Sequence, residues 1–210
     1  MSRQLSTLLL LHAALSGCAY TGTAVDIRPA ALKAEPGWLL LEDVPIVLQR
    51  GDSDCGAAAL AMVLQYLGEP ATLDQIISET GHTAGESLRA GDLRDLARRR
   101  GLQSFLYSGD QRDLVKHLGK GRPIIVGLVK QTLGDPISHY EVVIGYHPQR
   151  EVVVTLDPAR GWRVNAWPGF LDEWTRASQL ALVIVPRRPP SPPIRADVAR
   201  LSMAPGLVSD

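Results

Sequence analysis

Apolar positions are distributed differently in the two halves of the chain. Residues 55–67, with the sequence CGAAALAMVLQYL, are apolar on every face apart from Gln65, and Gly68 follows them. This pattern is typical of a buried helix that stops at a glycine. Further helices are predicted from the capping residue Thr72 to about Ser78, over DLRDLARRR (92–100) and over DQRDLVKHLGKG (110–121). The first half of the domain is therefore predicted to be mainly helical.

Runs rich in β-branched and aromatic residues follow the helices. They predict strands over 103–107, 123–129, 139–146, 152–156 and 180–185. The segment HPQRE joins the third run to the fourth as a hairpin, so these two strands should be antiparallel. The segment PGFLDEW (168–174) predicts one helical turn before the last strand. Helices first and an antiparallel sheet second indicate an α+β domain.

The two ends of the chain lack this patterning. Residues 1–17 contain one arginine and then an apolar run that is shorter than the roughly 20 residues needed to cross a bilayer, which is typical of a signal peptide. Residues 18–37 show little periodicity and are predicted to form a tether. Residues 187–210 begin in a proline-rich stretch and are predicted to be a disordered tail. The folded domain is expected over residues 38–186.

Length and charge exclude several classes of function. The chain has 210 residues, of which 45% are hydrophobic, which suffices for one domain with a core. Its 22 basic and 22 acidic residues give no basic field for nucleic acid. We find no GxxxxGK[ST] loop for a nucleotide, and neither paired cysteines nor a His-x3-His spacing for a metal. We therefore expect no cofactor, and a partner that is recognised at a local site.

The segment LSGC at residues 15–18 resembles the lipobox of bacterial lipoproteins, whose cysteine is lipidated and becomes the new first residue. A plain secretory signal with a coincidental cysteine is the alternative. The resemblance implies a lipid anchor at Cys18 and a place in the bacterial cell envelope. Because Ala19 rather than aspartate follows, we expect the outer membrane, with the protein facing the periplasm. Lipidation would leave Cys55 as an unpaired thiol in an oxidising compartment.

Cys55 begins the apolar helix and is either a packing residue or a nucleophile. The N–H groups at a helix start favour a thiolate, whereas Asp52 and Asp54 disfavour it, so an activated thiol needs a cationic partner such as an imidazolium. Among the five histidines, only His139 opens an apolar strand, and Asp157 ends the next strand. These residues are candidates for nucleophile, base and orienting acid. The alternative is a core cysteine, a strand-edge histidine and a turn aspartate.

The motif Q-x5-C-G at Gln49, Cys55 and Gly56, with HY at His139 and DP at Asp157, resembles the papain-like peptidases that cut double-glycine leaders of bacteriocins. The similarity extends over about residues 44–186. It implies a papain-like fold with the nucleophile at a helix N-terminus. It also implies that His139 is the base, that Asp157 orients it, and that Gln49 forms the oxyanion hole with the backbone N–H of Cys55.

Members of that family usually precede the membrane helices and ATPase of an export transporter. We find neither in this chain, which instead resembles stand-alone lipoprotein relatives. The expected function is a membrane-anchored cysteine peptidase that processes leader or envelope peptides, with a partner in an envelope or secretion system. A non-catalytic peptide-binding lipoprotein and an acyl transferase or deamidase are the alternatives. Gly56 is expected to let a substrate backbone approach the nucleophile.

Overall fold

The computed structural model describes residues 20–21, 23–33, 36–81 and 86–186. The expected signal peptide, Cys18 and the proline-rich tail lie outside the described residues. The first elements along the chain are β1 (Tyr20–Thr21), β2 (Val25–Asp26), α1 (Pro29–Lys33), β3 (Leu39–Leu40), α2 (Cys55–Tyr66), α3 (Leu73–Thr80) and α4 (Ala90–Arg99). They are followed by β4 (Gln103–Ser108), α5 (Gln111–Leu118), β5 (Ile124–Thr132), β6 (Ile137–His147), β7 (Val152–Asp157), β8 (Gly161–Ala166), α6 (Trp167–Arg176) and β9 (Leu180–Val185).

One antiparallel sheet organises these elements. Its strand order is β2-β8-β7-β6-β5-β9-β4, with β1 added to β5 and β3 added to β6. The central strands β5, β6 and β7 pair in sequence order through two hairpin connections, as the hydrophobic pattern predicts for β6 and β7. The prediction of an α+β fold with helices before an antiparallel sheet is confirmed.

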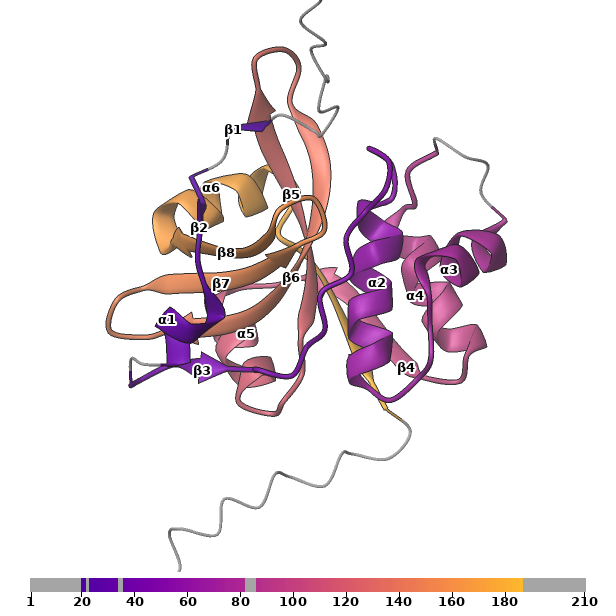
Figure 1. Ribbon diagram of the computed structural model, residues 1–210, viewed down its shortest axis with the longest axis horizontal. Coiled ribbons are helices and arrows are strands. Elements are labelled where there is room, and N and C mark those ends of the chain that lie inside the picture. Colours follow the sequence, from indigo (N-terminus) through magenta and orange to yellow (C-terminus); the bar gives the residue numbers. More distant parts are fainter. Residues whose placement is uncertain (1–19, 22, 34–35, 82–85, 187–210) are drawn as a thin grey trace, which may run out of the picture.

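Two hydrophobic cores lie on the two faces of this sheet. Helices α2, α3 and α4 lie on one side of β5 and β6, and α5 and α6 lie on the other (Figure 1). Neighbouring residues of β6 serve opposite cores, since Val142 packs with α2 and Val143 packs with α6. Alternate side chains of β6 therefore point toward α2 on one face and toward α6 on the other.

The predicted helix starts depend on local capping. Thr72 and Gln75 form the capping box expected at the start of α3, because each side chain bonds to the backbone N–H of the other residue. The helix predicted at 168–174 is longer than one turn and extends over α6. No helix in the described ranges is both long and apolar enough to cross a membrane.

The prediction of a tether over residues 18–37 is wrong for residues 23–33, which pack against the domain. Strand β2 pairs with β8, and Leu32 of α1 is buried in the same hydrophobic core as residues of α2. Buried Arg163 of β8 forms an ion pair with Asp26, and buried Asn165 accepts a hydrogen bond from Thr23. Packing therefore begins before residue 38. The polar residues of β8 make it resemble a loop in sequence, whereas in the structure it pairs with β7 on one side and with β2 on the other.

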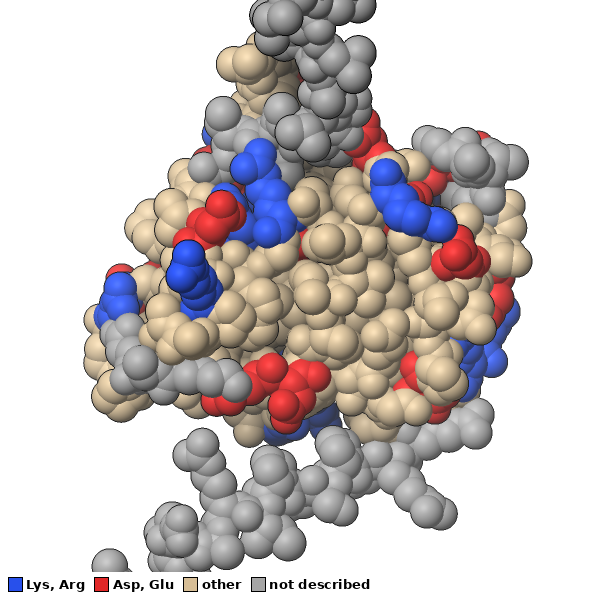
Figure 2. All heavy atoms as spheres, viewed as in Figure 1, with Lys and Arg blue, Asp and Glu red and all other residues tan. Residues whose placement is uncertain are grey.

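Charged residues of both signs lie on the visible surface. In Figure 2, lysines and arginines alternate with acidic residues around the edge of the face, and a broad area of uncharged residues fills its centre. This distribution agrees with a formal net charge of zero and gives no single-sign field on this face.

Candidate active site

Cys55 is the first residue of α2, and its side chain is buried. Asp54, the residue before α2, does not cap the helix with its side chain, because its carboxylate accepts from the backbone N–H of Gly51 at 3.0 Å. The backbone N–H groups of Cys55 and Gly56, at the start of the helix, interact with the sulfur. A third N–H, from Tyr140 of β6, interacts with it from the sheet.

Burial decides the charge state of this thiol. Loss of solvent raises the pKa of Cys55, and the three backbone N–H groups oppose that shift without cancelling it. The nearby carboxylate of Asp54 raises the pKa of Cys55 slightly further. The thiol is therefore neutral at pH 7 in the resting structure. Its activation by an imidazolium stays a prediction.

The structure brings His139 and Asp157 together. His139 Nε2 lies 2.8 Å from Asp157 Oδ1, and the two side chains are 2% and 0% exposed. The antiparallel pairing of β6 with β7 produces this contact, because it matches the start of one strand with the end of the other. Asp157 Oδ1 also accepts from the backbone N–H of Ala159 at 2.8 Å, which fixes the carboxylate.

The protonation states of this pair follow from burial. Burial lowers the pKa of His139 to about 4 and raises that of Asp157 to about 6, so at pH 7 the imidazole is neutral and the carboxylate is ionised. An ionised carboxylate only accepts hydrogen bonds, so Nε2 carries the proton and donates it. Nδ1 is then the basic nitrogen of the ring. Cys55 contacts β6 at Tyr140, which is the residue after His139.

Gln49 is tied to the same region through its backbone. Its backbone N–H donates to the carbonyl oxygen of Pro158 at 2.9 Å, directly after Asp157. Its side-chain Nε2 donates to the carbonyl oxygen of Gly51 at 3.0 Å. An amide nitrogen has two N–H groups, and the bond to Gly51 uses one of them. The loop before α2 is therefore attached to the turn that carries Asp157.

Gly56 packs closely against residues of two other segments. It is buried, and a Cβ atom at this position would lie 3.2 Å from Tyr140 Cδ2 and 3.5 Å from Leu88 Cβ. The missing side chain makes room for the Tyr140 ring. A role of Gly56 in substrate approach stays a prediction. Sequence reasoning missed Tyr140, whose backbone N–H and ring both lie against the start of α2.

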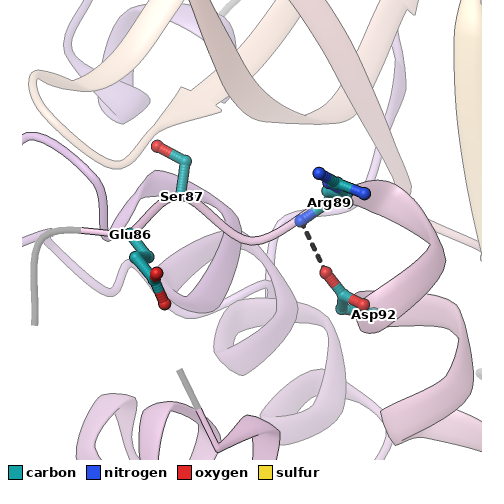
Figure 3. A pocket seen from close by; sticks show the side chains of 4 residues that line it. All are labelled: Glu86, Ser87, Arg89 and Asp92. Atoms are coloured by element: carbon teal, nitrogen blue, oxygen red, sulfur yellow. Dashed lines mark hydrogen bonds between the residues drawn. The ribbon is translucent and has the colours of Figure 1, made fainter. Parts of the chain in front are cut away.

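An open polar cavity of about 400 Å³ lies beside this part of the molecule. Its lining residues precede or begin α4 and are Glu86, Ser87, Arg89 and Asp92 (Figure 3). The backbone N–H of Arg89 donates to the Asp92 carboxylate at 2.9 Å. Leu88, between these residues, is the neighbour of Gly56, so the cavity is close to the start of α2. No sequence motif indicated it.

The site is not suited to a bound cation. His139, Glu141 and Asp157 hold a nitrogen and two carboxylate oxygens within 4.8 Å of one another, which is a composition that metals use. However, the ammonium of buried Lys130 lies 2.6 Å from Glu141 Oε1 and supplies the positive charge there. Among the described residues, this cluster therefore contains its own cation.

Comparisons with known proteins place this geometry in a family. No curated protein sequence matches the chain significantly. The peptidase domain of Streptococcus ComA, a bifunctional ABC transporter of a quorum-sensing pathway, is similar with a TM-score of 0.58 and 24% identity, covering 69% of this chain and 99% of that domain. A putative C39-like peptidase from Bacillus anthracis gives a TM-score of 0.59 at 22% identity, over 71% and 98% of the two chains.

A double-glycine motif protease from an AMS/PCAT transporter, solved in complex with the leader peptide, gives a TM-score of 0.53 at 25% identity. The match covers 68% of this chain and 91% of that one. These likenesses confirm the predicted papain-like fold with Cys55 at a helix start. The model of one family matches residues 41–182, which is more than half of the sequence. The chain belongs to the Peptidase C39-like family.

Proposed function

We propose that this protein is a cysteine peptidase that hydrolyses a peptide bond through a thioester on Cys55. The observation that carries the proposal is the buried hydrogen bond between His139 and Asp157, one residue away from the contact of Cys55 with β6. Membership of the Peptidase C39-like family supports the same class of reaction. A base with an orienting acid and a thiol at a helix start are the groups that covalent catalysis by cysteine uses.

The first step of the proposed reaction forms the thioester. Nδ1 of His139 takes the thiol proton while the sulfur of Cys55 attacks the peptide carbonyl carbon, and Asp157 holds the resulting imidazolium. The backbone N–H of Cys55 and the amide of Gln49 stabilise the oxyanion, and such a donor commonly contributes 100-fold or more. The imidazolium then gives its proton to the leaving amine as the C–N bond breaks.

Water completes the cycle. It loses a proton to Nδ1 of His139 and attacks the thioester carbon, and the C–S bond breaks to release a carboxylic acid product. The proton returns from His139 to the Cys55 sulfur, so the site regains its neutral thiol and neutral imidazole. All of these transfers are made by groups of this chain and by water.

The raised pKa of Cys55 makes the alkylation rate a test of the resting state. With Cys18→Ser, which leaves Cys55 as the single cysteine, the rate with iodoacetamide should rise about tenfold per pH unit between pH 7 and pH 9. The sign follows from burial, because a raised pKa moves thiolate formation to higher pH. A rate that is already constant below pH 7 would show a resting thiolate and contradict this description.

A peptide is the proposed substrate, of the leader or envelope class. The support is that one similar structure holds a leader peptide. The test is N-terminal profiling of envelope peptides after incubation with wild-type protein or with Cys55→Ala. New N-termini that occur only with the wild type would identify the cleavage site. Identical profiles would favour the non-catalytic binding module, whose buried thiol would also have a raised pKa.

We also propose a lipid anchor at Cys18 in the bacterial outer membrane, on the basis of the LSGC motif. Because β1 begins at Tyr20, a lipidated Cys18 would hold the domain close to the membrane surface. Cys18→Ala should therefore move the protein from the membrane fraction to the soluble fraction of the envelope. Cys55→Ala is the matched control and should stay with the membrane. If Cys18→Ala also stays there, the anchor is elsewhere.

A further inference from the structure

A group of buried charges lies in the sheet on the side of α6. Lys130 of β5 is 1% exposed, and its Nζ lies 2.6 Å from Glu141 Oε1 and 2.6 Å from Glu173 Oε2. The hydroxyl of Thr155 donates to Glu141 Oε2 at 2.5 Å. The four residues come from β5, β6, α6 and β7 and are all buried. We call Lys130, Glu141, Thr155 and Glu173 the Lys130 cluster.

The Lys130 cluster contains two carboxylates and one ammonium, so one negative charge is not balanced within it. Glu173 alone would neutralise Lys130, and its second oxygen accepts from the backbone N–H of Thr23 at 3.3 Å. Glu141 adds a second carboxylate, and contact with Lys130 keeps it ionised, since it lowers the pKa of Glu141 despite complete burial. Apolar residues of similar volume stabilise a protein core at least as well as buried ions do. The extra charge therefore calls for a role other than stability.

Glu141 lies next to the candidate base. It is two residues after His139 on β6, so both side chains are on the same face of the strand. A carboxylate oxygen of Glu141 and a ring nitrogen of His139 are within 4.8 Å of each other. His139 therefore faces Asp157 from β7 and Glu141 from its own strand.

Other charges also act on the His139 ring. Lys130 from β5 and Arg160, after β7, disfavour its protonation, whereas Glu141 favours it. Cys55 approaches from α2 through its contact with Tyr140. Burial has the largest effect and keeps the resting imidazole neutral. A negative charge that favours the protonated form is most useful when His139 has just received a proton.

We propose that Glu141 is a positioning residue of the candidate active site, whose fixed negative charge stabilises the imidazolium that His139 forms when it takes the Cys55 proton. This inference rests on the proposed peptidase function. No proton moves to Glu141, and no bond to it forms or breaks. Lys130 and Thr155 hold both oxygens of Glu141 in place. Glu173 balances Lys130, so that the charge of Glu141 remains effective toward His139.

Glu141→Gln tests the charge without changing the shape. The amide oxygen can still accept from Lys130, and Lys130 keeps Glu173 as its counter-ion. Glu151→Gln is the matched control, because it makes the same change at an exposed residue in the turn between β6 and β7. Glu141→Asp keeps the charge and is the rescue variant. Circular dichroism of each variant at each pH shows whether it is folded.

Protonation of His139 is followed by NMR of the imidazole ring in the Cys55→Ala background, which requires no peptidase activity. With Glu151→Gln, we expect about half of His139 to be protonated at pH 4. With Glu141→Gln, the fraction should be about one tenth, because loss of a nearby charge shifts such an equilibrium about tenfold. Glu141→Asp should restore most of the difference. Equal titrations in Glu141→Gln and Glu151→Gln would overturn the proposal.

Kinetics provide a second readout that does not need acidic conditions. In the presence of Cys55, Glu141→Gln should lower kcat for peptide cleavage about tenfold at pH 7 and leave KM unchanged. An unchanged kcat would overturn the role in the reaction. If the wild type cleaves no peptide, the proposed function fails, whereas the NMR titration still decides whether Glu141 acts on His139.

Discussion

Replacing Cys55 by alanine is expected to reduce peptide cleavage to the background rate, a loss of about 10⁴-fold or more. The sulfur is the atom that forms the thioester, and neither the backbone N–H groups nor His139 can replace it. The rate is measured on a peptide identified by N-terminal profiling. Cleavage by Cys55→Ala at the wild-type rate would rule out Cys55 as the nucleophile.

The fold should tolerate this change. Cys55 is buried at the start of α2, and alanine keeps its Cβ and the backbone N–H groups around it. Far-ultraviolet circular dichroism and thermal unfolding of Cys55→Ala should therefore stay close to the wild type. Cys55→Ser is a closer match in size and should be inactive as well, because a hydroxyl is a much weaker nucleophile.

Asp157→Asn should lower kcat about 100-fold without loss of stability. Asp157 Oδ1 accepts from both His139 and the backbone N–H of Ala159, and an asparagine oxygen at this position can keep both bonds. The orientation of the ring is then retained, and what is lost is the negative charge that stabilises the imidazolium. Asp157→Ala removes the orientation as well, so its loss of activity should be larger.

The melting temperature of Asp157→Asn distinguishes a role of Asp157 in the reaction from a role in packing alone. Burial raises the pKa of Asp157 to about 6 from the 3.8 of an exposed aspartate, so the folded protein becomes less stable as the pH rises from about 4 to about 6. The shift corresponds to up to about 3 kcal/mol at pH 7. Asparagine has no such cost, so Asp157→Asn should melt at pH 7 no lower than the wild type. A lower melting temperature with unchanged kcat would show that Asp157 is structural.

Local features of the fold could be predicted from the sequence. The apolar run after Cys55 specifies α2, and Thr72 with Gln75 specifies the start of α3. Alternation and a short hairpin connection also indicated that β6 pairs with β7, which is why the proximity of His139 and Asp157 could be expected.

Features that depend on distant pairing could not be predicted. Strand β8 has buried polar residues whose partners come from residues 23–26, and no period in either segment shows this. The Lys130 cluster unites residues from four elements that are far apart in sequence. The packing of Gly56 could not be predicted because the ring beside it belongs to Tyr140 of β6. In each case the contact is made by packing of the sheet rather than by a local pattern.

The most direct test of the central claim is the mass of the intact protein after a short reaction with its peptide substrate and an acid quench. A thioester on Cys55 predicts that the wild type gains the mass of the N-terminal product less one water, that the gain maps to Cys55, and that neutral hydroxylamine removes it. Asp157→Asn should gain it more slowly, and Cys55→Ala should not gain it. Cleavage that proceeds with no adduct on Cys55 under any quench, or an equal adduct in Cys55→Ala, would contradict the proposed mechanism.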